Sequence, residues 1–283
     1  MNGTALALVL VAAFVHAGWN LAAKRVDSGG ARFVFLYYTV GALACLPLAA
    51  FALATEPLRP QWTWLLAAVL TAIFHVLYGV VLQRGYRVGD LSVVYPLARG
   101  SGPLLSVIAA VALLGERPGV LGLAGAVLIV CGVLLIGGGK GGGNRRAGVF
   151  YGLLTGATIA AYTLWDDHSV NALAVPPVIY FTTGAVLQSA FLAPVVARQG
   201  EVLALWRRHW RETLIVGLLS PVAYLLVLFA MRMAPVSLVA PAREVSIVLG
   251  GLAAWLALGE ANPGRRIAGS VIVFAGIAAI AAS

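Results

Sequence analysis

The sequence reads Leu91-Ser92-Val93-Val94-Tyr95-Pro96-Leu97-Ala98-Arg99 at the start of one apolar segment and Val236-Ser237-Leu238-Val239-Ala240-Pro241-Ala242-Arg243 at the start of another. Gly115-Glu116 closes the first segment, and Gly259-Glu260 closes the second. Matched residues lie 144 or 145 positions apart, which is about half of the 283-residue chain. The chain is therefore predicted to contain two copies of one structural unit.

Two glycines spaced seven residues apart recur in the segments that follow, as Gly125 and Gly132 and again as Gly269 and Gly276. Small residues let helix backbones approach closely in lipid, so we interpret these four as helix-packing positions, with dimerisation as the alternative. Two aromatic matches link the earlier parts of the copies: Trp19 with Trp165, and Tyr37–Ala42 with Tyr180–Ala185.

The composition excludes an ordinary soluble domain. Hydrophobic residues make up 61% of the chain and charged residues 10%, whereas soluble domains carry about 25% charged residues. A membrane-spanning helix needs about 20 apolar residues, and ten segments approach that length: roughly 3–23, 31–54, 61–82, 90–114, 118–137, 147–166, 176–197, 213–231, 235–258 and 264–281. These runs are too long and too uniform for the strands of a membrane barrel. The predicted fold class is an all-α membrane protein with ten transmembrane helices.

The formal net charge of +9 follows the arrangement in the membrane and does not indicate nucleic-acid binding. Of the 19 basic residues, fourteen fall in the connections after the odd-numbered segments and three in the other connections. Arg84 and Arg87 after the third segment and Arg207, Arg208 and Arg211 before the eighth belong to the larger group. Lys and Arg accumulate in cytoplasmic loops. We therefore expect both termini outside and a multi-pass protein of the cell inner (plasma) membrane.

A glycine-rich stretch, Gly137 to Arg146, separates the two copies and is typical of a flexible linker. It is not a phosphate-binding loop, because Leu134 stands where such a motif has its first glycine and Gly141 follows Lys140. The predicted domains are residues 1–140 and 147–283, joined by a basic linker at 141–146. Five helices is an odd number, so the second copy is inverted relative to the first.

The sequence indicates neither a cleaved leader nor a metal or cofactor site. Met1-Asn2-Gly3 has no basic residue before the first apolar run, whereas Lys24-Arg25 follows that run. Cys45 and Cys131 fall in apolar segments and are interpreted as packing residues. No Cys/His cluster has the spacing of a zinc site. We expect no cofactor, no metal and no catalytic residue.

Arg99 and Arg243 are the foremost candidates for a binding site. Each lies about nine residues into its segment, where an unpaired Arg costs about 2.5 kcal/mol or more in a membrane. Prolines and glycines surround the first and Pro241 precedes the second, and interrupted helices near the midplane build transporter cavities. Two guanidinium groups suit a carboxylate or phosphate, whereas the alternative is that each Arg snorkels to an interface or pairs internally. Glu244 points away from its neighbour Arg243 on a regular helix, so its expected partner is Arg99 in the other copy.

Two polar and aromatic faces occupy equivalent places in the two copies. The first segment carries His16, Trp19 and Asn20, and the sixth carries Tyr162, Trp165 and Asp166 with the same spacing. Such faces avoid lipid and are predicted to line a cavity, whereas the alternative is an aromatic belt at the membrane surface.

Four further candidate substrate-binding residues are His75 and Tyr78 in the third segment, Tyr95 in the fourth and Tyr224 in the eighth. The complete predicted substrate-binding set adds Arg99, Arg243 and Glu244, and the residues of the two faces except Asp166, namely His16, Trp19, Asn20, Tyr162 and Trp165. His16 and His75 are of a type that titrates near neutral pH, so proton coupling through either is an alternative to simple hydrogen bonding. Glu116 and Glu260 follow glycines at segment ends and are expected to anchor loops by capping or pairing.

These features resemble the drug/metabolite transporter superfamily, in particular its EamA-type ten-helix members. The resemblance is carried by Trp19-Asn20 and Lys24, by Tyr95 to Gly100, and by Leu114-Gly115-Glu116 with its repeat Leu258-Gly259-Glu260. It implies a basket of ten helices, in which helices one to four and six to nine line a central cavity and helices five and ten support it from outside. The four-helix drug exporters of this superfamily bind cations and protons through a glutamate in helix one, and this chain has no acid there.

We therefore predict a secondary transporter, not an enzyme, that exports a small anionic or zwitterionic metabolite such as an amino acid by alternating access. A promiscuous multidrug exporter, which would not need Arg99 or Arg243, and a non-transporting membrane subunit are the alternatives. An intramembrane enzyme would need paired acids, a metal cluster or an activated nucleophile, which Glu244 alone does not supply. The expected partners are a small-molecule substrate and the lipid bilayer, without nucleic acid, and the protein is expected to be a monomer or a homodimer.

Overall fold

The computed structural model describes residues 1–23, 25–26, 29–89, 91–137, 144–249 and 263–283, and these form α-helices without a β-strand. The helices are α1 (Gly3–Ala23), α2 (Gly30–Thr55), α3 (Trp62–Val88), α4 (Leu91–Leu113), α5 (Gly119–Gly137), α6 (Arg145–Asn171), α7 (Pro177–Gln199), α8 (Val202–Met231), α9 (Val236–Ala242) and α11 (Pro263–Ala281). Lys24, Gly259 and Glu260 lie outside the described residues, as do residues 141–143 of the predicted linker.

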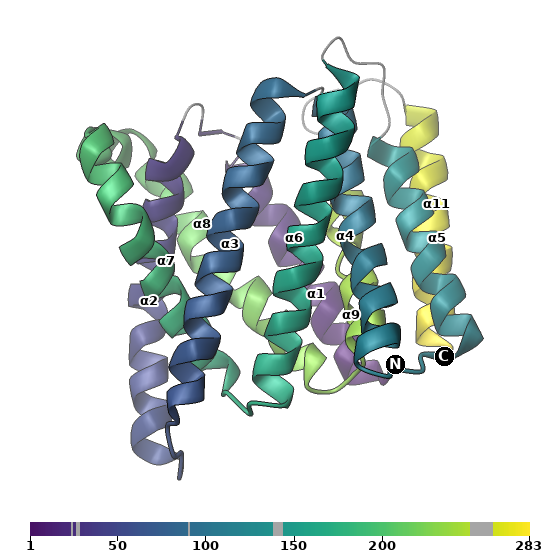
Figure 1. Cartoon of the computed structure of the whole chain (residues 1–283), viewed down its shortest axis with the longest axis horizontal. Coiled ribbons are helices and arrows are strands. Elements are labelled where there is room, and N and C mark those ends of the chain that lie inside the picture. The colour runs from purple at the N-terminus through teal and green to yellow at the C-terminus, as the bar shows by residue number, and fades with distance from the viewer. Residues whose placement is uncertain (24, 27–28, 90, 138–143, 250–262) are drawn as a thin grey trace.

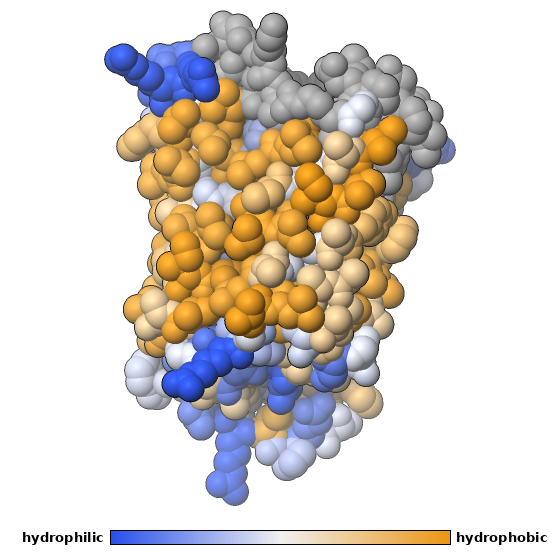
Figure 2. All heavy atoms as spheres, turned by 90° about the vertical axis from the view of Figure 1, so that its right-hand side faces the viewer, coloured by the Kyte–Doolittle hydropathy of each residue, from blue (hydrophilic) through white to orange (hydrophobic). Residues whose placement is uncertain are grey.

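Eight of the described helices are long and apolar enough to cross a membrane, which confirms the predicted class of multi-pass, all-α membrane protein. Figure 2 shows the outer surface of such a protein, with a broad hydrophobic band bordered below by hydrophilic residues. The ninth predicted segment, 235–258, is described only as far as residue 249, and it holds the short helix α9. The predicted number of ten spanning helices therefore stays a prediction.

The helices pack in reciprocal pairs. α1 contacts α8 while α6 contacts α3, and α4 contacts α6 while α9 contacts α1. α2 contacts α7, and α5 contacts α11. The counterparts of α1, α2, α3, α4 and α5 in the second copy are α6, α7, α8, α9 and α11. Exchanging each helix with its counterpart gives the same set of contacting pairs, as the two-fold relation of an inverted repeat requires. Both termini lie at one end of the molecule, and the last residues of α1, α3, α5 and α7 lie at the opposite end (Figure 1). We call the latter the basic end, because the connections that it holds are those rich in Lys and Arg, and the former the terminal end.

The four repeated glycines are helix-packing positions, as predicted, and the two helices that they join are α5 and α11. A Cβ atom on Gly132 would lie 2.7 Å from the carbonyl oxygen of Gly269, and one on Gly125 would lie 2.6 Å from that of Gly276. Contacts this short leave no room for a side chain, so the absence of one lets the two backbones touch. The pair stands beside the other helices at one edge of the molecule (Figure 1).

Several helices extend further than the hydrophobic pattern predicts, and in α3 and α8 the added residues include arginines. α3 continues to Val88, so Arg84 and Arg87 lie in its last turns and not in a connection. α8 begins at Val202, eleven residues before the predicted start, and includes a kink at His209 (φ −128°, ψ 32°). Basic side chains with long apolar stems are compatible with a helix at a membrane surface because their charged ends reach water, so hydrophobicity alone places the helix end too early.

The two predicted helix interruptions differ. α4 runs without a break through Pro96 and Pro103. α9 instead ends at Ala242, Arg243 and Glu244 form a turn, and helical residues resume at 245–249. Within this turn the Glu244 amide donates to the Pro241 carbonyl oxygen at 2.9 Å, an i to i+3 bond in place of the regular i to i+4 bond. The interruption prediction is therefore confirmed for Arg243 and wrong for Arg99.

Glu116 anchors the start of α9. Its two carboxylate oxygens each accept a bond of 2.9 Å, one from the backbone N–H of Val236 and one from that of Ser237. These N–H groups have no partner within the helix. A negatively charged carboxylate at this position also interacts favourably with the positive end of the helix dipole. The predicted anchoring role of Glu116 is confirmed, and it links the connection after α4 to the second copy.

Candidate functional site

A cavity of about 950 Å³ lies between the two copies. The described residues on its wall come from α1, α2, α3, α4, α6, α7 and α8, together with Arg243 after α9, and none comes from α5 or α11. This is the division of helices that the family resemblance implies.

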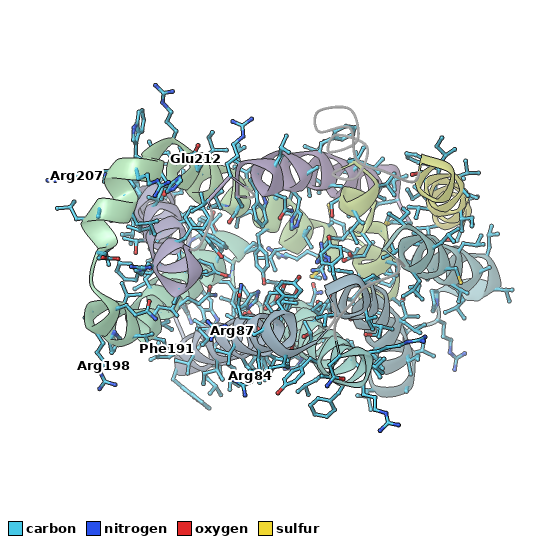
Figure 3. The ribbon with its side chains drawn as sticks, turned by 90° about the horizontal axis from the view of Figure 1, so that it is seen from above. Arg84, Arg87, Phe191, Arg198, Arg207 and Glu212 are labelled. Carbon is cyan, nitrogen blue, oxygen red and sulfur yellow. The ribbon has the colours of Figure 1, made fainter. Side chains whose placement is uncertain are left out.

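The cavity is open toward the basic end. Its wall reaches Gly29–Arg32 at the start of α2, Arg84 and Arg87 in the last turns of α3, and Gln199 at the end of α7. Seen from this end, Arg84 and Arg87 stand on α3, while Arg198 and Arg207 lie at the outer edge formed by α7 and α8 (Figure 3). None of the described connections at the terminal end contributes to the wall, so the cavity is closed there.

Glu244 lies between the two arginines deep in the molecule. Its carboxylate is 3.4 Å from Nε of Arg99 and 3.5 Å from Nε of Arg243, and its side chain is 1% exposed. The predicted pairing with Arg99 is confirmed. The prediction that adjacent Arg243 and Glu244 would not pair is wrong, because the two residues form a turn and do not follow the 100° spacing of a helix.

The two guanidinium-bearing side chains face the cavity. Both arginines line the cavity, whereas Glu244 does not. Arg243 places Nη2 3.5 Å from the hydroxyl of Thr163, and its Cζ lies 5.9 Å from the centre of the Tyr162 ring. Two positive charges against one negative charge leave a net charge of +1 beside the cavity. An anion that entered would meet donors in the fork geometry that suits a carboxylate or phosphate.

Every charged side chain on the described wall is positive. The wall holds no Asp or Glu, and its arginines are Arg32, Arg84, Arg87, Arg99 and Arg243. Nη1 of Arg32 lies 2.8 Å from a carboxylate oxygen of Glu201, and Glu201 is not part of the wall. Arg84 and Arg87 extend the positive charge from the deep pair to the opening. Such a series attracts anions and raises their local concentration.

Aromatic rings cover much of the remaining wall. His75 stacks on Tyr162 with ring centres 4.3 Å apart, and Tyr78 meets Tyr162 edge-on at 5.8 Å. His16 meets Trp19 at 4.5 Å on the α1 side. Besides Nε of Arg99 and of Arg243, two buried polar atoms of wall residues have no hydrogen-bond partner within the described residues, namely Trp19 Nε1 and Gln188 Oε1. The cavity thus offers rings for an apolar body and a donor and an acceptor for further polar groups.

A cluster of hydroxyl groups around Asp166 lies where the cavity ends. Oδ1 of Asp166 accepts from the Thr71 hydroxyl at 2.8 Å and from the Tyr180 hydroxyl at 2.6 Å, and Oδ2 accepts from the Tyr224 hydroxyl. The Asp166 side chain is 2% exposed. The cluster ties α6 to α3, α7 and α8.

Ten of the twelve predicted site residues line the cavity: His16, Trp19, Asn20, His75, Tyr78, Tyr95, Arg99, Tyr162, Tyr224 and Arg243. Trp165 does not, because its indole N–H donates to the backbone oxygen of Ala67 on α3 at 3.0 Å. Glu244 lies behind the two arginines. Asn20 is on the wall, but its amide donates to the His16 carbonyl at 2.9 Å. Direct contact of Trp165 or Glu244 with a substrate is therefore not supported by the geometry.

Sequence reasoning missed several residues of this region. Tyr37 and Tyr180 occupy matched positions in the two copies and both lie on the wall, so the duplication was a usable signal for them. Gln188 and Thr71 carried no such signal, because a single amide or hydroxyl in an apolar helix is common. Asp166 was recognised as part of a polar face but not as the centre of a cluster.

Comparisons with known proteins agree with this architecture. The model of the EamA-like transporter family matches the chain twice, over residues 3–138 and 146–282. A solved structure, described only as the crystal structure of a protein, is similar with a TM-score of 0.78 and 20% sequence identity, over 99% of this chain and 96% of that chain. At that identity the likeness concerns the fold alone. No curated protein matches the sequence. The two matches of the family model cover nearly all of the chain, which therefore belongs to the EamA-like transporter family.

Proposed function

We propose that this membrane transporter carries a small organic anion or zwitterion, such as an amino acid, whose carboxylate binds between Arg99 and Arg243. The charge of the cavity wall is the main support for this proposal, because the described lining residues include five arginines and no carboxylate. A cation would leave water for a positive environment without a counter-charge, which is costly. An anion instead gains charge-assisted hydrogen bonds from donors that Glu244 holds in place.

Alternating access is the proposed mechanism. Two inverted copies with a site between them favour a rocking motion that opens the site to one end at a time. The cavity wall reaches only the basic end in the described residues, which suits one of the two states of such a cycle. The positive connections favour the cytoplasm for this end, so we assign the structure to an inward-open state in a cell inner (plasma) membrane.

Export is the proposed direction. The EamA-type resemblance implies it, and an inward-open cavity lined by arginines would collect anions from the cytoplasm. Arg84 and Arg87 lie near the opening and Arg99 lies deeper, so the positive charge continues along the route that a substrate would follow.

A multidrug exporter is the second candidate, favoured by the size of the cavity and its aromatic wall. The two candidates differ in charge preference. Drug exporters that act on cations place an acid in the cavity, whereas the acid nearest the deep arginines, Glu244, is buried and already paired.

A thermal-shift experiment with three matched compounds tests the proposal. Leucine, 4-methylpentanoate and isopentylamine share a branched apolar body and are a zwitterion, an anion and a cation. A bound ligand stabilises the folded state according to its concentration relative to its Kd. The anion and zwitterion should raise the apparent Tm, and the amine should not. A shift with isopentylamine alone would overturn the proposed charge preference.

A further inference from the structure

We propose that Asp166 is a proton-binding site: its ionised form holds the terminal end of the cavity shut, and its protonated form releases that end. The inference rests on the proposed transport function, since it concerns the opening of the same cavity. His16 and His75 were the sequence-based candidates for proton coupling, whereas the contacts in the structure favour Asp166.

The carboxylate of Asp166 is held by neutral donors. Thr71, Tyr180 and Tyr224 each donate a hydroxyl hydrogen to it, and no ion pair joins it to a cation within the described chain. Hydrogen bonds to an ionised acceptor are about twice as strong as those between neutral groups. Without a neighbouring cation, the ionised form of the buried carboxylate is stabilised by these three hydrogen bonds. The three bonds are in turn strong because the carboxylate is ionised.

The cluster lies where the cavity would have to open. Asp166 is five residues before the end of α6, Tyr180 is three residues after the start of α7, and both of these helix ends lie at the terminal end (Figure 1). Thr71 belongs to the first copy, whereas Tyr180 and Tyr224 belong to the second. Separating α6 from α3 and α8 at this end requires breaking the bonds of Asp166 to Thr71 and Tyr224.

His75 connects the cluster to the cavity. Its Nδ1 is 2.9 Å from the backbone oxygen of Thr71, a distance that assigns the hydrogen of the neutral ring to Nδ1. Nε2 then has a free lone pair, and it lies 3.4 Å from the hydroxyl oxygen of Tyr224. His75 and Tyr224 both line the cavity, so protons from the water phase have a route of two side chains to Asp166.

Protonation changes the direction of these bonds. Oδ2 has a single donor, so a proton from the aqueous phase fits there and becomes a hydroxyl hydrogen facing Tyr224. Tyr224 then accepts from Asp166 and turns its own hydrogen to Nε2 of His75. Oδ1 keeps Thr71 and Tyr180 as donors but loses its charge, so both bonds weaken. One proton is taken up, Asp166 becomes neutral, and no other group changes charge.

The other titratable groups around Asp166 come from each neighbouring helix. On its own helix they are Tyr162, Asp167 and His168, and facing it are His75 from α3, Tyr180 from α7 and Tyr224 from α8. Arg243 reaches the same helix at Tyr162 and Thr163. Asp167 differs from Asp166 in its partner, because its carboxylate accepts from the Asn171 amide at 2.9 Å. It is thus a matched control one residue away.

Cysteine labelling reports the opening directly. Ser169 is fully buried and lies one helical turn beyond Asp166 toward the terminal end, and Ser220 lies on the cavity wall. The Ser169→Cys and Ser220→Cys variants are made separately, with Cys45 and Cys131 replaced by alanine. Each purified protein in lipid nanodiscs is reacted with a bulky maleimide at about pH 4, near the ordinary pKa of aspartate, and at about pH 8, well above it. Rates are divided by that of the SDS-denatured variant at the same pH.

We expect the corrected rate at Ser169→Cys to rise about tenfold from the higher to the lower pH, the change that the loss of charge on the shared acceptor predicts. Adding Asp166→Asn should give the fast rate at both pH values, while Asp167→Asn should keep the pH dependence. Tyr224→Phe, which removes one donor and no carboxylate, should raise the rate at both pH values and keep the dependence. This last variant keeps the test decisive if Asp166→Asn does not fold.

Equal rates at the two pH values in the parent, or a pH dependence that survives Asp166→Asn, would overturn the assignment of Asp166. Ser220→Cys separates this assignment from the proposed transport mechanism. A fall in its rate at the lower pH indicates that one end closes as the other opens. An unchanged Ser220 rate with a faster Ser169 rate supports the proton site and contradicts alternating access.

Discussion

Glu244→Gln should lower stability and strengthen anion binding at the same time. The substitution keeps the size of the side chain and removes the negative charge between Arg99 and Arg243. At 3.4 Å and 3.5 Å, each opposite-charge contact amounts to about 5 kcal/mol at an effective dielectric of about 20 and to about 1 kcal/mol in bulk water. The arginine side chains are 14% and 11% exposed, so the surroundings lie between these limits.

The net change is smaller than the sum of the two contacts, because neutral Gln also avoids the cost of burying a carboxylate. Breaking a buried pair by removing one partner costs about 3–5 kcal/mol, and contact with a water-filled cavity reduces that figure. We expect a loss of about 2–3 kcal/mol, which corresponds to a fall in apparent Tm of about 5 °C for a chain of this size.

The assay is thermal unfolding of the detergent-solubilised protein with and without 4-methylpentanoate. The variant should melt lower than the wild type and gain more from the anion, because two unpaired guanidinium groups then face the cavity. Glu212→Gln is the matched control: its carboxylate lies 3.7 Å from a ring nitrogen of His209 and away from the cavity wall, so its Tm should stay close to that of the wild type. An unchanged Tm for Glu244→Gln, or an equal response of both proteins to the anion, would show that Glu244 does not balance the two arginines.

Three further outcomes follow from the packing and the topology. Gly132→Leu should destabilise the protein by more than about 2 kcal/mol, because its Cβ would lie 2.7 Å from the Gly269 oxygen. Gly18→Leu is the control and should not destabilise the protein, because its Cβ would meet nothing within 4 Å. Equal Tm values of the two variants would contradict the packing role of Gly132. Glu116→Ala should cost about 1–2 kcal/mol in unfolding free energy by leaving two N–H groups at the start of α9 without their acceptor, and a Tm equal to that of the wild type would contradict the capping role. A reporter enzyme that works only in the cytoplasm should be inactive when fused to the C-terminus, because the termini lie opposite the basic connections (Figure 1); strong activity would reverse the proposed orientation.

The membrane class, the duplication and ten residues of the cavity wall were predictable from sequence, because each depends on a pattern that the bilayer imposes. Apolar length predicts spanning helices, and polar side chains within them must turn away from lipid. That constraint correctly placed Arg99, Arg243, His75 and Tyr162 on an inner wall. Repeat-equivalent glycines were correctly interpreted as packing positions, although the sequence did not indicate that they join α5 to α11.

The details that pattern could not supply depend on local backbone and on distant partners. Pro96 and Pro241 occupy matched positions, yet α4 is continuous and α9 ends at Ala242, so the same residue type has different effects in the two copies. The pairing of adjacent Arg243 and Glu244 follows from that local turn. Trp165 shares its spacing with Trp19 but bonds to Ala67 on α3, a partner 98 positions away that no periodicity in the chain indicates.

The central claim is that a carboxylate held by Arg99 and Arg243 crosses the membrane with this protein. The most direct test measures uptake by proteoliposomes of whichever carboxylate compound gives the largest thermal shift. Uptake should depend on the protein and fall by at least tenfold in Arg99→Ala and in Arg243→Ala, because losing a desolvated charge partner costs about 2–5 kcal/mol. Arg99→Lys should recover part of the rate, and Arg207→Ala, an exposed change at the start of α8, should leave it unaltered. Transport at the wild-type rate by either alanine variant, or uptake of isopentylamine in preference to every carboxylate tested, would contradict the account.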